Sequence, residues 1–375
     1  MNQGFENRSR FKKPPLLHGY TFRPEQARMA GCQSKLLSIR IEISNKCNLS
    51  CKYCYHKDHE YEKDEIDFIV LQGIIDQAYD LGAGSVVISG GEPLLYPEFQ
   101  ELIGFINNKK MIPVVLTNGL LVTADVASYL YEKNVSVIAK LDSLRPSVQD
   151  FCAGLSGAYI EIQAGLHNLI QAGFAELNNP ELLRMGISFV CNRMNVEEVE
   201  EIWHFCRRHN IFPDIRMLKP VGRAKKYLSN YYLDNESIKN CKIKMLSIDR
   251  EQYGFDWLPY TPVFACNCFY PSCSLYVTVD GNVRPCPIVR FDENRSFFKN
   301  GLYPYNVFHK NLEEIYSSEI FCYARNVEKY LEGKCSDCLF LEECIGCRGN
   351  AYNIGIEQGL DPYQAFRMEC LQCFK

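Results

Sequence analysis

The sequence lacks a long apolar run and a marked excess of charge of either sign. In its 375 residues, no apolar stretch reaches the ~20 residues that a membrane-spanning helix needs. The net charge is −4, so composition favours neither a nucleic acid nor an anionic membrane as a partner. The first residues, MNQGFENRSRFKKPP, lack the apolar segment of a signal peptide. These absences predict a cytoplasmic protein with no nucleic-acid or membrane partner.

Cysteine, by contrast, is abundant and unevenly placed. The chain has 19 cysteines, an odd number in a compartment that disfavours disulfides, so clustered cysteines there are expected to bind metal or do chemistry. Three of them, Cys47, Cys51 and Cys54, fall within eight positions, and eleven lie between Cys266 and Cys373. Those in the middle of the chain stand alone and are expected to be small buried side chains, namely Cys152, Cys191, Cys206 and Cys241.

Short β-branched runs alternate with longer helical patterns from residue 36 to about residue 220. The expected strands are 36–44, 85–91, 113–119, 136–143, 185–192 and 214–222. The expected helices are 64–82, 97–108, 123–133, 158–172 and 195–209. Such alternation predicts parallel strands joined by crossover helices. Six β/α units predict an α/β fold with an open, partial (β/α)6 barrel, because a complete barrel has eight units.

Each expected strand ends in a polar or glycine-containing motif. The motifs are the cysteine loop, GGEP (90–93), TNG (117–119), KLDS (140–143), CNRMN (191–195) and PVGRA (220–224). The carboxyl ends of parallel strands meet at one face, where α/β folds build their sites. The series therefore predicts a single site at the mouth of the barrel.

The chain divides into four expected regions. Residues 1–35 form a basic N-terminal arm, residues 36–235 the partial barrel, residues 236–265 a linker, and residues 266–375 a small cysteine-rich domain. Within that last region, residues 276–287 read as a hairpin whose turn is Asp280-Gly281.

The spacing of Cys47, Cys51 and Cys54, with Tyr53 before the last cysteine, is suited to an incomplete iron–sulfur site. Four-iron clusters are usually held by four cysteine thiolates. A loop that supplies only three leaves one iron without a protein ligand, and that iron can bind a substrate or a cofactor.

This loop, together with Gly90-Gly91-Glu92-Pro93 at the end of the next strand, resembles the radical S-adenosylmethionine (SAM) enzymes. The resemblance implies that SAM chelates the open iron of a [4Fe-4S] cluster through its amino and carboxylate groups. One-electron reduction would then give methionine and a 5′-deoxyadenosyl radical, which abstracts a hydrogen atom from the substrate. The cofactor supplies the difficult chemistry, while the protein orients and shields it.

The resemblance assigns further residues to SAM. Glu92 would lie near the SAM amino group, and Gly90 and Gly91 would let the backbone approach the cofactor. Asn118 would line the same mouth, Ser188 and Asn192 would reach the ribose, and backbone from Val221 to Arg223 would border the adenine. Taken alone, Glu92 can equally be a loop charge, Asn118 a turn residue and Asn192 a helix cap.

Two positions depart from the family pattern. Lys140 stands where a serine is common, and Ala153, within QDFCAG, stands where an arginine often pairs with the SAM carboxylate. We expect Lys140 to supply the missing positive charge; the alternative is a lysine that faces solvent at the barrel rim.

The C-terminal cysteines resemble the SPASM extension of radical SAM enzymes, which holds two auxiliary [4Fe-4S] clusters. The resemblance gives one cluster Cys268, Cys273, Cys286 and Cys347, and the other Cys335, Cys338, Cys344 and either Cys370 or Cys373. Cys266 can replace Cys268 or Cys273. The interval from Cys344 to Cys347 is one residue short of the usual one, and no cysteine follows Asp361-Pro362 closely. Zinc is the alternative metal, although zinc ribbons usually separate their cysteine pairs by more than five residues.

The fold and clusters together predict an oxidoreductase or maturase that modifies a peptide or protein by crosslinking, epimerisation or oxidation. The alternative substrate is a sugar or aminocyclitol, and a non-catalytic electron-transfer protein is an alternative of another class. The basic arm can bind an acidic leader peptide or simply pack on the barrel, and no leader-binding domain is expected before residue 36. Ferredoxin or flavodoxin is the expected reductant. An epimerase would need a spare cysteine, for which Cys241, Cys266, Cys322 and Cys370 or Cys373 are candidates.

Overall fold

The fold is built on six adjacent parallel strands. The computed structural model describes residues 10–55, 63–219, 221–259, 261, 263–265, 267–293, 295–298 and 301–370. The six strands are β2 (Ser38–Ser44), β3 (Ser85–Gly90), β4 (Ile112–Thr117), β5 (Ser136–Lys140), β7 (Met185–Cys191) and β8 (Phe212–Met217). Every neighbouring pair among them is parallel. The mixed α/β class with a parallel sheet is therefore confirmed.

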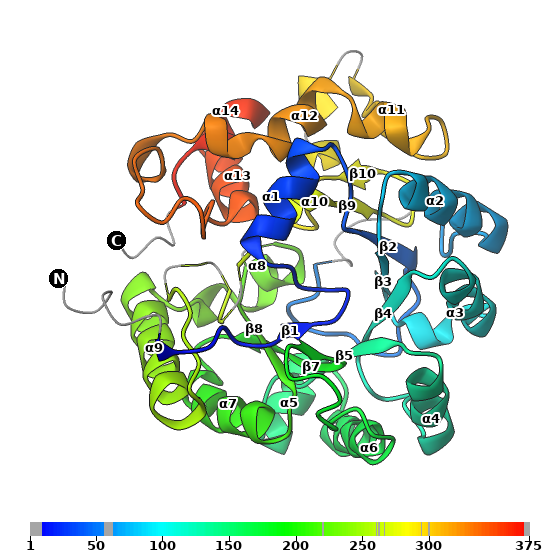
Figure 1. Cartoon of the computed structure of the whole chain (residues 1–375), viewed down its shortest axis with the longest axis vertical. Helices are drawn as coiled ribbons and strands as arrows, with labels where there is room; N and C mark the ends of the chain where they lie inside the picture. Colours follow the sequence, from blue (N-terminus) through cyan, green and yellow to red (C-terminus); the bar gives the residue numbers. More distant parts are fainter. Residues whose placement is uncertain are drawn as a thin grey trace.

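Helices cover the outer face of this sheet (Figure 1). They are α2 (Phe68–Asp80), α3 (Phe99–Asn108), α4 (Ala124–Glu132), α5 (Pro146–Ala153), α6 (Ala158–Gln171) and α7 (Val199–Arg208). The sequence pattern placed the start of α2 at residue 64, but the helix begins four residues later. Residues 64–66 instead form an antiparallel bridge with the end of β2, since Asn45 N donates to Asp64 O at 2.8 Å and Ile66 N to Ile43 O at 2.9 Å. Helix α5 was not expected; it starts at a proline, which suits a first helical turn.

Alternation along the strands produces two apolar layers. In β2, Ile39, Ile41 and Ile43 join the large core beneath the helices. A second layer fills the inner face of the sheet and consists of Leu17, Val87, Val114, Ile138, Leu183 and Phe212. Two of its members come from the short parallel pair β1 (Leu16–Leu17) and β6 (Leu182–Leu183). The N-terminal segment thus helps to close the apolar floor of the barrel.

The cysteine-rich region is continuous with the sheet. After α10 (Tyr270–Cys273), strand β9 (Ser274–Val277) pairs in parallel with β2, and β10 (Val283–Arg284) pairs antiparallel with β9. The expected hairpin therefore exists, and it extends the sheet to eight strands in the order β10-β9-β2-β3-β4-β5-β7-β8. No pairing within the described chain joins β8 to β10. The remaining helices of this region are α11 (Leu312–Tyr316), α12 (Glu319–Arg325), α13 (Arg348–Glu357) and α14 (Pro362–Arg367).

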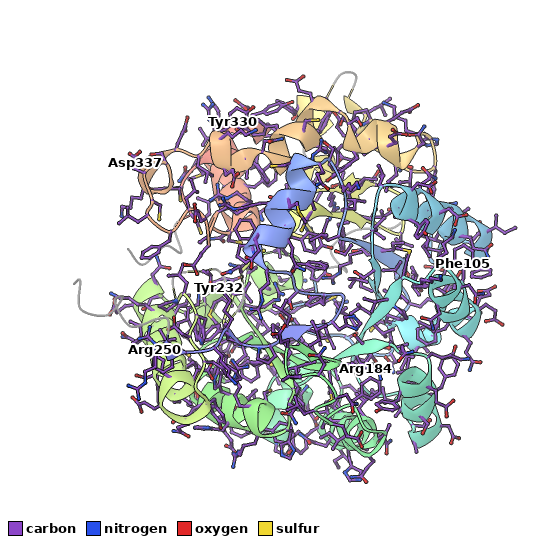
Figure 2. All side chains as sticks on the ribbon, viewed as in Figure 1. Phe105, Arg184, Tyr232, Arg250, Tyr330 and Asp337 are labelled. Atoms are coloured by element: carbon purple, nitrogen blue, oxygen red, sulfur yellow. The ribbon has the colours of Figure 1, made fainter. Side chains whose placement is uncertain are left out.

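The segment expected to be a linker packs on the barrel. It follows α8 (Arg223–Tyr227) and contains most of α9 (Asn235–Ile248) and a π-helical turn over Asp249–Tyr253. Buried Asp249 accepts hydrogen bonds from Trp203 of α7 at 2.8 Å and from Trp257 at 2.9 Å. Arg250, labelled in Figure 2, pairs with Asp256 at 2.6 Å. These contacts fix the segment against α7.

The described part of the N-terminal arm also packs on the chain, whereas residues 1–9 lie outside the described residues. Its helix α1 (Pro24–Cys32) contacts α10. Arg28 pairs with Glu328 at 3.2 Å, and Arg23 donates to Pro14 O at 2.9 Å. The arm thus contacts the cysteine-rich region through α1 and Arg28, while its strand β1 pairs with β6 of the barrel. Within the described ranges, none of the helices combines the length and apolar character needed to cross a membrane.

Candidate functional site

The three-cysteine loop follows β2 and is held by the end of β3. Gly91 N donates to Ser44 O at 2.7 Å, and Glu92 N donates to Lys46 O at 2.8 Å. A Cβ added at Gly90 would overlap the carbonyl oxygen of Ser44, and one at Gly91 would overlap that of Lys46. Gly90 also has φ +134°, a conformation that favours glycine. The two glycines are therefore needed for the close approach of the cysteine loop itself.

A second clamp holds the far side of the loop. Ser50 N donates to Ala153 O at 3.1 Å, and Lys52 N donates to Cys152 O at 3.0 Å. Arg223 N donates to Cys54 O at 3.0 Å from the start of α8. Ala153, the position where related chains often have an arginine, is buried and contributes its carbonyl to the loop. The loop geometry is thus set by backbone hydrogen bonds from three different elements.

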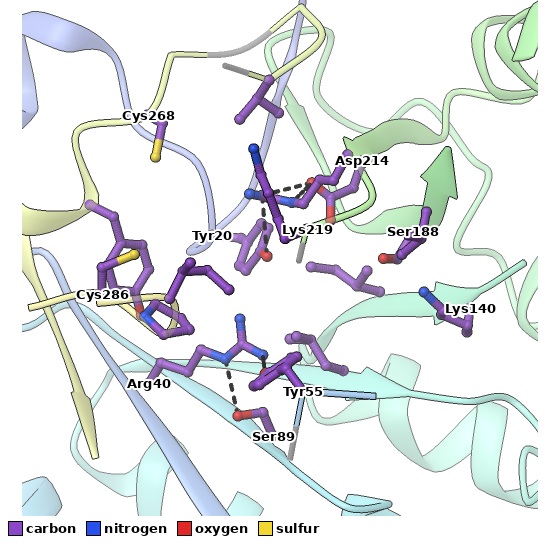
Figure 3. Close-up of a pocket in the computed structure, with 18 of the residues that line it drawn as sticks. Tyr20, Arg40, Tyr55, Ser89, Lys140, Ser188, Asp214, Lys219, Cys268 and Cys286 are labelled. Carbon is purple, nitrogen blue, oxygen red and sulfur yellow. Dashed lines mark hydrogen bonds and ion pairs between the residues drawn. The ribbon is translucent and has the colours of Figure 1, made fainter. Parts of the chain in front are cut away.

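All three loop cysteines line one cavity of about 380 Å³. It lies at the carboxyl ends of the strands, as expected, and Figure 3 shows it between Lys140 and Ser188 on one side and Cys268 and Cys286 on the other. Six residues assigned to SAM from the sequence line it, namely Gly90, Gly91, Asn118, Lys140, Ser188 and Val221. Asn118 Nδ2 donates to Asn48 Oδ1 at 2.7 Å, which ties strand β4 to the cysteine loop.

Glu92 lies behind the cavity wall and does not line the cavity. Its side chain is fully buried and accepts hydrogen bonds from Thr117 Oγ1 at 2.8 Å and from Asn118 N at 2.7 Å. Burial raises the pKa of Glu92 to about 7, although these hydrogen bonds act in the opposite direction. In this structure Glu92 therefore positions the Asn118 turn.

Asn192 is also buried away from the cavity. Its backbone N–H donates to Asn195 Oδ1 at 2.8 Å, and its own Oδ1 accepts from Met194 N at 2.8 Å. This arrangement stabilises the turn after β7. Asn192 is not the helix cap that the sequence offered as the alternative, because the residue that precedes the next short helix, Val196–Glu198, is Asn195.

Lys140 belongs to a three-residue polar cluster at the end of β5. Its Nζ lies 3.1 Å from Asp142 Oδ1 and 4.4 Å from the centre of the Tyr53 ring. The Tyr53 hydroxyl donates a short hydrogen bond to the other oxygen of Asp142. Burial raises the pKa of Tyr53 well above its usual value, and Asp142 adds to the rise. Lys140 therefore faces the cavity beside the cysteine loop and not bulk solvent.

The thiol of Cys51 is buried enough to resist ionisation without a metal. Burial raises the pKa of Cys51 to about 12; Cys54 adds to the rise, while Lys140 opposes it. A coordinated metal ionises a thiol outright, so such sites hold metal better than they serve as free nucleophiles. Among the described residues, no three Cys, His, Asp or Glu side chains are grouped for one metal ion. In a four-iron cluster each thiolate binds a different iron, so three thiols around one cavity fit that group.

One set of C-terminal cysteines borders the same cavity. Cys268, Cys273 and Cys286 line it opposite the cysteine loop. Burial raises the pKa of Cys286 to about 12, and the nearby Cys268 and Cys347 contribute to the rise. Cys347 likewise adds to the raised pKa of Cys268. Cys268 in turn adds to the raised pKa of Cys273. The four cysteines that the resemblance assigned to one auxiliary cluster therefore lie near one another.

A second set lies farther from the cavity, where Cys370 and Cys344 flank Gly346. A Cβ added at Gly346 would lie 2.7 Å from Cys370 Cβ and 2.6 Å from Arg348 Nη2, while Gly346 N donates to Cys344 Sγ at 3.3 Å. Lys334 N donates to the Glu369 side chain at 2.9 Å, which brings the segment of Cys335 toward Cys370.

Buried Arg348 has an orphaned edge beside this second set. It donates from Nη1 to the carbonyls of Phe366 and Met368, but Nε and Nη2 find no partner among the described residues. An anionic thiolate cluster fits beside that orphaned edge. Cys335, Cys338 and Cys344, with either Cys370 or Cys373, thus remain the predicted ligands; Cys266 and Cys373 lie outside the described residues.

Several cavity residues were not found from the sequence. They are Tyr20, Arg40, Tyr55, Asp214, Arg216 and Lys219, several of which Figure 3 shows around the centre of the cavity. A signal for one of them, Arg40, exists in SIRIEIS (38–44), where charged residues alternate with isoleucines. Because successive strand residues face opposite sides, Arg40 and Glu42 share the face opposite the isoleucines. Tyr20 comes from the N-terminal arm, and no sequence pattern links that arm to the site.

Family models match two parts of the chain. The radical SAM superfamily model matches residues 41–206, and the SPASM model, an iron–sulfur cluster-binding domain, matches residues 266–339. Together they cover more than half of the chain.

Similar proteins act on different substrates. An AdoMet-dependent heme synthase from Nitratidesulfovibrio vulgaris is 24% identical over 88% of this chain and 93% of its own. The mycofactocin maturase MftC of Mycobacterium tuberculosis is 30% identical over 50% of this chain and 46% of its own.

The fold is also that of a solved enzyme structure. SuiB of Streptococcus suis, bound to its precursor peptide SuiA, aligns with a TM-score of 0.66 over 94% of this chain and 80% of its own at 17% identity. The two matched domains bring SAM and [4Fe-4S] clusters as cofactors, including auxiliary clusters in the SPASM domain. The chain is therefore an enzyme that belongs to the radical SAM superfamily and carries a SPASM domain.

Proposed function

We propose that the protein cleaves SAM reductively at the three-cysteine loop and removes a hydrogen atom from a substrate in the adjoining cavity. One observation carries this proposal: Cys47, Cys51 and Cys54 line a single cavity together with residues from the ends of other strands. When bound to the open iron, SAM supplies a 5′-deoxyadenosyl radical after one-electron reduction. The cluster and SAM would be held by the loop thiols and by the strand-end residues described above.

The chain's own residues orient the reactants and exclude water. Asn118 fixes the loop through Asn48, and the amide of Asn118 is fixed in turn by Glu92. Lys140 supplies a positive charge beside Tyr53 that suits the SAM carboxylate. The apolar layer containing Val87, Val114 and Ile138 closes the floor below the cavity. A radical formed above this floor is shielded from solvent on that side.

We propose a peptide or protein as the substrate, modified by crosslinking, epimerisation or oxidation. The support comes from relatives: MftC is a maturase, and SuiB has been solved with a precursor peptide. A small molecule is the second candidate, and the relative that aligns over nearly its whole length, a heme synthase, favours it.

The reductant and location follow from the same chemistry. We propose ferredoxin or flavodoxin as the one-electron donor and the cytoplasm as the compartment. A reducing compartment suits buried thiols such as those of Cys51 and Cys286 that must stay available to iron.

Deuterium transfer can identify the substrate class. The anaerobically reconstituted enzyme would be incubated with SAM, dithionite and extract of the source organism grown in deuterated medium. The extract would first be separated by ultrafiltration into macromolecular and small-molecule fractions. We expect deuterated 5′-deoxyadenosine with the macromolecular fraction and none with a Cys47/Cys51/Cys54→Ala variant. Label only from the small-molecule fraction would overturn the peptide proposal, and absence of 5′-deoxyadenosine with either fraction would overturn the proposed reaction.

A further inference from the structure

We propose that Arg40 is the anion-binding residue of the cavity and that it holds a carboxylate or phosphate group of the substrate. This inference rests on the proposed function and names the chemical class of the substrate.

Arg40 occupies an unusual place for a guanidinium. It lies in the middle of β2, between Ile39 and Ile41, whose side chains pack into the outer core. Its own side chain points to the inner face and lines the cavity, as Figure 3 shows. Inward-facing strand positions of α/β barrels are usually filled by branched apolar residues. A charged residue at this position therefore needs a reason beyond packing.

Two hydrogen bonds fix the guanidinium and leave one edge available. Arg40 Nε donates to Ser89 Oγ at 3.0 Å, and Nη2 donates to the Tyr55 hydroxyl at 2.8 Å. A guanidinium carries five N–H donors, so both donors on Nη1 and one on Nη2 are not used by these bonds. That Nη1–Nη2 edge matches the two oxygens of a carboxylate or phosphate in bidentate geometry.

Arg40 also lacks the carboxylate partner that two other cavity cations have. Lys140 pairs with Asp142 at 3.1 Å, and Arg216 pairs with Asp214 at 2.8 Å. Among the residues that the structure describes, Arg40 forms no ion pair with any carboxylate. Glu42 on the same strand is the carboxylate that acts on the pKa of Arg40, and it acts less than the hydroxyls of Tyr55, Tyr20 and Tyr270 do.

Glu42 is a weak counter-charge at neutral pH. Burial raises its pKa to about 7, even though Arg284 and Arg40 favour its ionised form. A cation out of bulk water without a full counter-charge is costly, and an anionic ligand offsets that cost. The position of Arg40 is therefore best explained by an anion that arrives with the substrate.

The surroundings suit an amphipathic ligand with one anionic end. Apolar side chains of Leu116, Ile138, Met217 and Phe269 line the same cavity. In Figure 3, Arg40 lies between the strand-end residues Lys140 and Ser188 and the auxiliary-cluster residues Cys268 and Cys286. A group bound to Arg40 would thus anchor a substrate between the SAM site and the first auxiliary cluster.

Calorimetry on the SAM-loaded, unreduced holoenzyme tests this inference without turnover. The probes are propionate and hydrocinnamate, each compared with its neutral amide. Phenyl phosphate is added to distinguish recognition of a phosphate from recognition of a carboxylate. The variants are Arg40→Gln, Arg40→Lys and a matched control, Arg208→Gln, on the exposed surface of α7. Iron content and melting temperature verify the fold of each variant.

We expect a carboxylate or phosphate probe to bind the wild type and the Arg208→Gln control at least tenfold more tightly than its neutral counterpart. Arg40→Gln should lose about tenfold or more of that affinity. Arg40→Lys should keep part of it, because lysine retains the positive charge but lacks the paired N–H donors of the guanidinium. Equal affinity for hydrocinnamate and its amide, together with no binding of phenyl phosphate, would overturn the inference, as would unchanged probe binding in Arg40→Gln. Loss of SAM binding in place of probe binding would assign Arg40 to the cofactor and also overturn it.

The two proposals fail separately. Anion binding that depends on Arg40, in a wild type that forms no 5′-deoxyadenosine, would overturn the reaction and keep the anion site. Formation of 5′-deoxyadenosine without selectivity for anionic probes would keep the proposed reaction and overturn the anion site.

Discussion

The two ends of the cavity are built from cysteines in different ways. On one side, Cys47, Cys51 and Cys54 come from a single loop after β2. On the other, Cys268, Cys273 and Cys286 come from the segment around the β9–β10 hairpin, and their neighbour Cys347 lies just before α13. The first set is one thiol short of a complete [4Fe-4S] ligand set, whereas the second has four. A site for chemistry and a closed site can thus be told apart by ligand number.

The means of holding the two sets also differ. The loop is clamped by backbone contacts to Gly91, Cys152 and Ala153, so its shape depends on the absence of side chains. In the second C-terminal set, farther from the cavity, a charged side chain takes part, since Arg348 and Cys370 both lie next to Gly346. Substitutions should therefore affect the two regions separately.

The largest effect is expected from Gly91→Ala. The added methyl would overlap the Lys46 carbonyl and displace the cysteine loop, so one of three clusters should be lost. Iron would fall from about twelve to about eight atoms per chain, and 5′-deoxyadenosine formation would fall at least a hundredfold. Iron analysis and mass spectrometry measure both. Gly104→Ala is the control, since a methyl there meets nothing within 4 Å; equal losses in both variants would refute the clamp.

Lys140→Met should affect SAM binding at the three-cysteine loop and leave the C-terminal cysteines unchanged. Removing the cation at the cavity wall should weaken SAM binding to the oxidised holoenzyme by about tenfold, the usual range for a charged hydrogen bond. The variant also leaves Asp142 without its 3.1 Å ion pair. Equilibrium dialysis with labelled SAM gives the affinity, with Lys244→Met, which breaks an exposed pair with Glu200, as the control. Unchanged SAM affinity would show that Lys140 does not serve the SAM carboxylate.

Arg348→Gln should act only on the second C-terminal set of cysteines, which lies farther from the cavity. Loss of a buried positive charge beside Cys370 favours the oxidised cluster, so its reduction potential should fall. A shift on the order of 60 mV corresponds to ~1.4 kcal/mol for a one-electron couple. Redox titration followed by electron paramagnetic resonance would detect it. Arg367→Gln, which removes a partly exposed pair with Glu332, should leave the potential in place; equal shifts would contradict this role for Arg348.

The smallest effect concerns the acid that supports the loop. The pKa of Glu92 is about 7 in the folded protein against an ordinary 4.5, so the folded state binds its proton more tightly. Protonated Glu92 therefore contributes to the free energy of unfolding. This contribution is complete below pH 4.5 and is lost as pH rises to about 7, a change of up to about 3 kcal/mol. Glu92→Gln should flatten this part of the pH dependence, measured by anaerobic urea unfolding at several pH values. An identical pH dependence in wild type and variant would contradict the raised pKa.

Sequence reasoning located the strands and the motifs at their ends because both depend on local patterns. Cys47, Cys51 and Cys54 share one loop, so spacing alone identified them. The same reasoning could not separate Asn118, which lines the cavity, from Asn192, which is buried in a turn. Side-chain direction decides between them, and it depends on neighbours distant in the sequence.

Other features depend on contacts that no local pattern reveals. Pairing of β9 with β2 joins the cysteine-rich region to the barrel sheet, and Tyr20 reaches the cavity from the N-terminal arm. Glu92 was expected at the SAM amino group, but its oxygens face Thr117 and Asn118. Arg40 was readable in principle from the alternation in β2, since its neighbours Ile39 and Ile41 face the helices.

Anaerobic SAM cleavage tests the central claim most directly. The enzyme would be reconstituted with iron and sulfide, supplied with SAM and dithionite, and assayed for 5′-deoxyadenosine by mass spectrometry. The account predicts product from the wild type and from Cys206→Ala, which removes an isolated buried cysteine of α7, and none from Cys47/Cys51/Cys54→Ala. Product from that triple variant at the wild-type level would contradict the claim that the three-cysteine loop is the site of SAM cleavage.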